Sequence, residues 1–339
     1  MLKNKDTLTQ CSKKVNRKSK LIVILGPTAS GKSDLAVKLA KSPALSKIEG
    51  FNGEIVCADS RQVYRGMSIG TASPSLRSPG LPVVIHHLFN FVEPNKPLNV
   101  ATYKKMAIKT IKDIQKRGKM PFLVGGTGLY VKAIVDNLKF PKMEPNAKLR
   151  KELEQKTAPQ LFGIYKKLDK KGALQIDKNN KRRLIRAIEV CKITGEPFWT
   201  QRQKAIPLFD ILQIGINAPK TELEKRIKKR TEKMFKQGLE KEVKKLVKKY
   251  GWTPVLQNTI GYSEWRASSK PLGGLDFPRS HSVALTASHA TKKELQELIS
   301  LHTIQYAKRQ MTWFKKNERI LWVKNYQEAA RKVLTFLND

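Results

Sequence analysis

The chain has 339 residues, of which 40% are hydrophobic and 7% aromatic, so it is long enough to bury a sizeable core. Its 67 Lys and Arg against 28 Asp and Glu give a formal net charge of +39, which favours a polyanionic partner, either nucleic acid or an anionic membrane surface, although a lysine-rich proteome would explain part of it. The three cysteines form no C-x-x-C pair and the apolar runs are too short to cross a bilayer, which excludes a zinc ribbon and a membrane span and favours the cytoplasm.

The beginning of the chain combines a basic tail with a phosphate loop. Residues 1–19 carry scattered lysines without an apolar stretch, so we expect a disordered tail and not a secretory signal. An apolar run at 21–25 then leads into a match to G-x-x-x-x-G-K-[ST], formed by Gly26, Pro27, Thr28, Ala29, Ser30, Gly31, Lys32 and Ser33. Glycines let backbone amides surround a phosphate, Lys32 supplies a point charge, and Ser33 can ligate Mg²⁺. The chain is therefore predicted to bind a phosphate or diphosphate.

The segment 20–141 alternates strand and helix patterns, which predicts the first part of a P-loop α/β core with a parallel sheet flanked by helices. A helix of period near 3.6 is expected between Asn99, its N-cap, and Gly118, its stop. Further strands are expected at 54–58, 82–85 and 122–124.

From 142 to 207 helical patterns dominate, which predicts an all-helical insertion into the core. The remainder, 208–339, is expected to complete the core and to end in helices. Its predicted features are a strand at 209–216, a capping box from Thr221 to Glu224 that opens a basic helix, a surface excursion at 267–290, a long helix through 295–313, and a strand at 319–323.

Polar residues follow two of the expected strands. Ligands of parallel α/β sheets lie beyond the carboxyl ends of the strands, so Asp59, Ser60 and Thr127 should share a rim with the phosphate loop. In a P-loop kinase or ATPase, Asp59 would be a Mg²⁺ ligand; as a structural residue it would cap a loop. The polar stretch at 58–72 continues as an extended loop and not as a helix, which disfavours the kinase interpretation.

This loop and the phosphate loop together resemble those of the bacterial tRNA dimethylallyltransferases. Further blocks agree in order and spacing: HHL at 86–88, LVGGTGLY at 123–130, RRLIRAIEV at 182–190, IGYSE at 260–264 and AKRQMTWF at 307–314. The resemblance covers nearly all of 20–323, and several ordered blocks are specific where a single one is not. The family's eukaryotic zinc finger is absent, which indicates a bacterial-type enzyme.

The resemblance implies transfer of a dimethylallyl group from dimethylallyl diphosphate to the exocyclic amine of the tRNA adenosine immediately 3′ of the anticodon. The phosphate loop would then hold a prenyl diphosphate with Mg²⁺ at Ser33, and not ATP. It also implies Asp59 as general base, Thr127 as a hydrogen-bonding partner near the adenine, and Arg230 as a second cation on the diphosphate. Without the resemblance, Arg230 could equally be one more exposed charge, and Thr127 an ordinary turn hydroxyl.

The resemblance further implies a monomeric protein that binds the tRNA anticodon stem-loop. The residues that would contact it are Asp59, Ser60, Arg61, Gln62 and Thr127, then Arg150, Arg182, Arg183 and Arg186, and finally Thr259, Ile260, Gly261, Tyr262 and Ser263. Arg183 and Arg186 are three apart on an expected helix and should point the same way. Three alternatives remain: a P-loop small-molecule kinase, a prenyltransferase acting on free adenine nucleotides, and a non-catalytic RNA-binding protein.

Overall fold

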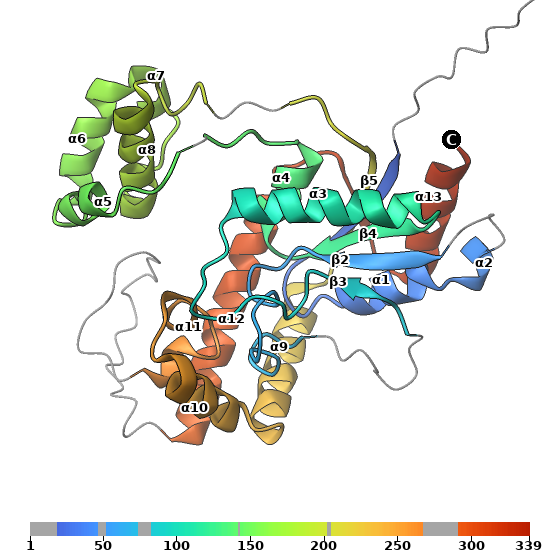
Figure 1. The fold of residues 1–339 in the computed structure, drawn as a ribbon. Helices are drawn as coiled ribbons and strands as arrows, with labels where there is room; N and C mark the ends of the chain where they lie inside the picture. The colour runs from blue at the N-terminus through green and yellow to red at the C-terminus, as the bar shows by residue number, and fades with distance from the viewer. Residues whose placement is uncertain (1–18, 47–51, 74–82, 142, 202–204, 267–290) are drawn as a thin grey trace, which may run out of the picture.

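A computed structural model describes residues 19–46, 52–73, 83–141, 143–201, 205–266 and 291–339 (Figure 1). Most of the predicted basic tail and the whole predicted surface excursion at 267–290 therefore lie outside the described residues.

The core of the protein is a six-stranded sheet in which all neighbouring strands are parallel. The strands, in sheet order, are β3 (His86–His87), β2 (Gly53–Cys57), β4 (Met120–Gly125), β1 (Lys20–Leu25), β5 (Asp210–Ile216) and β6 (Ile320–Val323). Strand β1 lies in the middle, with Ile22 opposite Phe122 on one side and Leu212 on the other. The residues that follow β1, β2 and β4 therefore meet at one edge, as predicted.

The predicted strand at 82–85 is misplaced. Pairing begins where the amide of Ile55 donates to the carbonyl of Ile85 at 2.8 Å, and the strand itself is His86–His87. Val83 and Ile85 are 68% and 51% exposed. Val84 between them is buried in the core, so this stretch joins the core through one side only as it approaches the edge strand. A hydrophobic pattern alone does not show where strand pairing begins.

Helices cover both faces of the sheet (Figure 1). Helices α3 (Val100–Lys116) and α4 (Gly128–Val135) pack on one face, and α1 (Lys32–Ala40) and α13 (Tyr326–Asn338) on the other; α2 (Pro43–Ser46) follows α1. Because both faces are buried, β1 can be a continuous apolar run. The predicted ends of α3 are confirmed: the Asn99 side chain accepts from the amide of Thr102, and Gly118 has a φ of +70°.

Four helices between β4 and β5 form a unit with its own apolar core, seen in Figure 1 standing apart from the sheet. They are α5 (Ala147–Glu154), α6 (Ala158–Leu168), α7 (Lys170–Ala173) and α8 (Lys181–Thr194). Their core is built from residues such as Leu153, Leu161 and Leu184. The predicted fold class, a P-loop α/β core with an all-helical insertion, is confirmed.

The last part of the chain adds helices around the rim of the sheet. They are α9 (Lys220–Lys236), α10 (Leu239–Tyr250), α11 (Pro254–Gln257), the 3₁₀ turn η1 (Ser263–Trp265) and α12 (Lys292–Phe314). The predicted capping box is wrong: α9 begins at Lys220, directly after Pro219, so Thr221 lies inside the first turn and caps nothing. None of the described helices is both long and apolar enough to cross a membrane.

Candidate active site

The phosphate loop follows β1 in a conformation that its glycines permit. Gly31, with a φ of +87°, is the N-cap of α1, and Ala29 before it also has a positive φ of 61°. A Cβ on Gly26 would lie 2.8 Å from the Ser30 hydroxyl, so the close approach there requires glycine. Ser30 Oγ itself is buried and has no hydrogen-bond partner among the described residues. The loop thus places an unused hydroxyl and a helix N-terminus where an anion can bind.

Two cations meet at this loop. Lys32 Nζ lies 3.4 Å from the carbonyl of Pro27, and Arg230 reaches in from α9 to donate from Nη1 to the Thr28 hydroxyl at 2.8 Å. Within the described part of the chain, neither cation forms an ion pair at salt-bridge distance. The structure therefore places Arg230 on the phosphate loop and not on an exposed helix back.

Burial disfavours the charged form of both cations. It lowers the pKa of Lys32, which the charge of Asp59 partly opposes and that of Arg230 reinforces. Burial likewise lowers the pKa of Arg230 to about 10, again opposed by Asp59. The two positive charges thus face one nearby carboxylate, which leaves an excess of positive charge for a bound anion to neutralise.

A glutamine from α12 connects the phosphate loop to the glycine-rich turn after β4. Gln310 Oε1 accepts from the amide of Thr28, and its Nε2 donates to the carbonyl of Gly126, both at 2.8 Å. A Cβ on Gly126 would lie 2.3 Å from that Nε2. The sequence block at 307–314 marked this region, but nothing in it identified Gln310 as the connecting residue.

Asp59 stands directly beyond β2 with one carboxylate oxygen engaged. Its Oδ1 accepts from the amides of Arg61 at 2.8 Å and Gln62 at 3.4 Å. The loop-cap interpretation is therefore correct for that oxygen. No hydrogen bond within the described residues uses Oδ2, so the same carboxylate is oriented by one oxygen and keeps the other for a ligand.

Thr127 joins the ends of β4 and β2. Its hydroxyl accepts from the amide of Ser60 at 2.9 Å and donates to the Ser60 hydroxyl at 3.2 Å. A second missed residue, Tyr306 of α12, lies near Thr127 and Asp59; burial, helped by the charge of Asp59, raises its pKa to about 12, so the phenol stays protonated. The predicted trio Asp59, Ser60 and Thr127 is thus brought together at one rim.

The predicted RNA-binding segment 259–263 lies next to the Asp59 loop and supports it. Arg61 Nη2 donates to the carbonyl of Asn258 at 3.0 Å, which links the two segments. Thr259 and Tyr262 are buried, and the Tyr262 hydroxyl donates to Glu242 of α10 at 2.6 Å. Ile260 and Ser263 remain partly exposed. In this structure Thr259 and Tyr262 therefore support the Asp59 loop, and only Ile260 and Ser263 leave part of their side chains exposed to a ligand.

Glu242 is the centre of that support. Its carboxylate accepts from three consecutive backbone amides, those of Ser68, Ile69 and Gly70, at 2.8–3.1 Å. Such a concave run of amides is a natural anion site, here occupied by a side chain of the protein itself. It fixes the far end of the Asp59 loop on α10.

The predicted arginines of the insertion lie on two helices. Arg182, Arg183 and Arg186 belong to α8, where Arg182 is exposed and the other two are half-buried. Arg150 of α5 and Arg186 both contact the carboxylate of Glu189, which sequence reasoning did not single out. These arginines are far from the phosphate loop in the sequence, and Figure 1 shows that α5 and α8 also lie apart from the sheet.

The residues at the phosphate loop fit a magnesium ion bound together with a phosphate ligand. The described residues contain no cluster of three His, Cys, Asp or Glu side chains. Mg²⁺ commonly uses few protein ligands and completes its shell with phosphate oxygens and water. The Ser33 hydroxyl, at the start of α1 and outside every hydrogen bond between described residues, has the required chemistry.

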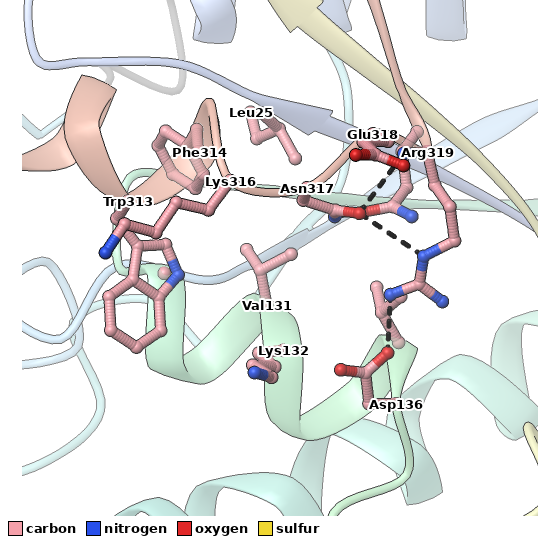
Figure 2. A pocket seen from close by; sticks show the side chains of 13 residues that line it. Leu25, Val131, Lys132, Asp136, Trp313, Phe314, Lys316, Asn317, Glu318 and Arg319 are labelled. Atoms are coloured by element: carbon pink, nitrogen blue, oxygen red, sulfur yellow. Dashed lines mark hydrogen bonds and ion pairs between the residues drawn. The ribbon is translucent and has the colours of Figure 1, made fainter. Parts of the chain in front are cut away.

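A separate pocket of about 530 Å³ lies between α4, the end of α12 and the chain before β6 (Figure 2). Arg319 donates to Asp136 at 2.5 Å on one side, and the Trp313 indole lies against Gly128 on the other. Gly128 is next to Thr127, but the lining includes neither Asp59 nor the two phosphate-loop cations. The pocket is therefore a neighbour of the rim and not the place where its charged groups meet.

These features define a P-loop α/β protein with a phosphate loop after its central strand, a carboxylate at the same rim and an inserted basic helical unit. Residues 62–317 match the IPP transferase family, and the chain belongs to this family. Similar proteins include the tRNA dimethylallyltransferases of Gloeothece citriformis, 39% identical over 90% of this chain and 91% of the relative, and of Geobacter sulfurreducens, 38% identical over 90% and 92%.

Solved structures give the same result. The tRNA isopentenylpyrophosphate transferase of Bacillus halodurans is 32% identical, with a TM-score of 0.63 over 95% of this chain and 96% of that one. A eukaryotic dimethylallyltransferase acting on tRNA shares the fold at 24% identity, with a TM-score of 0.71 over 95% of this chain and 79% of that one.

Proposed function

We propose that this protein transfers the dimethylallyl group of dimethylallyl diphosphate to the exocyclic amine of the tRNA adenosine immediately 3′ of the anticodon, and releases diphosphate. The observation that carries this proposal is the meeting of Lys32, Arg230 and Asp59 at one rim, in a chain of the IPP transferase family. The activity named for the relatives supplies the two substrates.

The phosphate loop and its cations act on the leaving group. When the allylic carbon–oxygen bond breaks, its electron pair moves to the diphosphate, which becomes more negative. Lys32 and Arg230 already lie at the phosphate loop, so they stabilise the departing group there by their positive charge. A magnesium ion held at Ser33 would supply further positive charge to the same oxygens when bound.

Asp59 acts on the other substrate. The adenine nitrogen forms a new carbon–nitrogen bond as the carbon–oxygen bond breaks, and it must lose a proton. Asp59, oriented through Oδ1, accepts that proton on Oδ2 as general base. The Thr127 hydroxyl, held by Ser60, is positioned to hydrogen-bond the adenine beside it.

We assign binding of the RNA to the basic insertion. A base in an anticodon loop must leave its stack to reach a rim such as this one, at a cost of a few kcal/mol. Phosphate contacts from basic residues offset that cost. A tRNA substrate also places the protein in the cytoplasm, and because one chain supplies every residue named at the rim, we infer that it acts as a monomer.

The test is transfer of label from dimethylallyl diphosphate to an anticodon stem-loop RNA in the presence of Mg²⁺, with AMP as a parallel acceptor and ATP as a parallel donor. Label on the RNA adenine alone is the expected result. Label on AMP would instead assign the protein to prenyl transfer onto free nucleotides. Turnover of ATP without any prenyl transfer would contradict the proposal and favour a kinase.

A further inference from the structure

The insertion buries the carboxylate of Glu189 completely. Glu189 lies in the middle of α8, and its side chain is 0% exposed. An unpaired charge in such a place is strongly unfavourable, so this residue has to be compensated by its neighbours.

Four hydrogen bonds supply that compensation. Oε1 accepts from the backbone amide of Asn146 at 2.9 Å and from Arg150 Nε at 2.7 Å; Oε2 accepts from Arg150 Nη2 at 2.8 Å and from Arg186 Nη1 at 2.6 Å. Burial by itself raises the pKa of Glu189, but the hydrogen bonds from Arg150, Arg186 and Asn146 outweigh it and hold the pKa below its usual range. The carboxylate is thus charged and its bonding capacity is used.

The two arginines keep a second, outward side. Their side chains are 39% and 37% exposed although each is fixed on the buried carboxylate. Two cations against one anion leave the cluster with a net charge of +1. A guanidinium carries five N–H donors in a rigid fork, so an arginine held by part of its donors can still offer the others to a phosphate.

We infer that Glu189 is a positioning residue for RNA binding: it holds Arg150 and Arg186 as a preformed pair of guanidiniums that bind phosphates of the tRNA backbone. The inference rests on the proposed function, because it needs the insertion to face RNA. Ordering a free arginine side chain on binding costs up to about 2 kcal/mol, and a pair that is already ordered avoids that cost.

A simpler account, in which only charge matters, and the positioning role predict different results for Glu189→Gln. If the arginines act only through their charge, removing this negative charge raises the net charge by one and RNA binding becomes tighter or stays the same. If Glu189 positions them, the neutral amide turns donors toward the guanidiniums, the pair loses its order, and RNA binding weakens although the protein becomes more positive.

The experiment measures binding of the full chain to an anticodon stem-loop RNA across a series of salt concentrations, for wild type, Glu189→Gln and Glu152→Gln. Glu152 is an exposed carboxylate on the same helix as Arg150, so its variant is a matched control for the change in charge. We expect Glu189→Gln to weaken binding roughly tenfold, the scale of one hydrogen bond to a charged group, and to flatten the salt slope by about 0.7–0.9 for each phosphate that is no longer neutralised. Glu152→Gln should match wild type or bind slightly tighter.

Kinetics distinguish positioning from loss of folding. With saturating RNA, Glu189→Gln should keep the wild-type kcat for prenyl transfer while its KM for RNA rises. If thermal unfolding shows that this variant is not folded, Arg186→Lys replaces it, since lysine keeps the charge but not the fork and should also weaken binding. Equal or tighter binding by Glu189→Gln than by Glu152→Gln, or by Arg186→Lys than by wild type, overturns the inference. Failure of the wild-type chain to bind the RNA overturns the proposed function itself.

Discussion

The rim of the sheet and the helical insertion each contain a pair of cations, but the two pairs differ in whether a carboxylate of the protein forms ion pairs with them. At the rim, Lys32 and Arg230 are partly buried and make no described ion pair, and burial lowers the pKa of both. In the insertion, Arg150 and Arg186 share the buried Glu189. The rim is therefore a site that its ligand must complete, whereas the insertion brings its own counter-charge.

This difference has an energetic meaning. Partly buried cations that only Asp59 compensates are a cost to the free protein, and this cost is recovered when an anion binds, so binding energy at the rim is concentrated on a small, highly charged group. The insertion carries no such cost, and its net charge is spread over exposed guanidiniums. It suits the diffuse charge of an RNA backbone, whose contacts are numerous and individually weak.

The largest effect is expected when the carboxylate of Asp59 at the rim is removed. Asp59→Asn should lower the rate of prenyl transfer by about 10²–10⁴-fold, the usual contribution of a general base, while RNA binding stays close to wild type. Single-turnover transfer and filter binding on the same preparations measure the two properties. Turnover near the wild-type rate would remove Asp59 from the base role.

The next largest effect is expected when one cation of the rim is removed. Lys32→Met should lower transfer by about 10²–10³-fold, because a donor of charge stabilisation to the leaving group is removed. The matched variant Arg230→Lys keeps its charge and loses only the hydrogen bond to Thr28, so its rate should fall less. Steady-state kinetics with varied dimethylallyl diphosphate measure which variant loses more activity. A larger loss for Arg230→Lys than for Lys32→Met would show that the geometry of the hydrogen bond matters more than the charge at this site.

In the insertion a smaller and different effect is expected. Arg183→Ala together with Arg186→Ala should weaken RNA binding and flatten its salt dependence by about 0.7–0.9 for each phosphate that the arginines no longer neutralise. Transfer at saturating RNA should be unaffected, in contrast to the rim variants. A salt slope identical to that of wild type would show that these two arginines do not neutralise RNA phosphates.

The smallest effect is a pH dependence confined to the rim. Because the pKa of Lys32 is lowered in the free protein and a bound anion favours its protonated form, binding of inorganic diphosphate should take up protons at alkaline pH. The affinity for diphosphate should then fall as pH rises through the Lys32 pKa of the free protein, by at most about tenfold per pH unit for each proton taken up. Calorimetry in two buffers of different ionisation enthalpy measures the uptake; the Lys32→Met variant should lose it.

How far the sequence predicts this molecule depends on the range of the interactions. The phosphate loop, the position of α3 between Asn99 and Gly118, and the placing of Asp59 and Thr127 at one rim are set by neighbouring residues and by parallel-sheet geometry, and they were predictable. The predicted strand at 82–85 failed because an apolar run next to an edge strand has the same pattern as a buried one.

The residues that sequence reasoning missed all act across long separations in the chain. Gln310 contacts Thr28, which is 282 positions away, and Glu189 contacts Arg150 across 39 positions. Tyr262 carries a polar group that is typical of a contact residue, yet it is buried because Glu242 of another helix receives its hydroxyl. Only the folded chain shows which partner is within reach of each side chain.

Gln310 joins the two parts of the rim to which the two substrates are assigned. One amide group contacts both the loop assigned to the leaving group and the turn that carries the residue assigned to the acceptor. A shift of α12 along its axis would move both contacts in the same direction, so the gap between donor and acceptor is insensitive to that motion. In the proposed reaction, one side chain of fixed length would therefore set the distance between the diphosphate site and the adenine site.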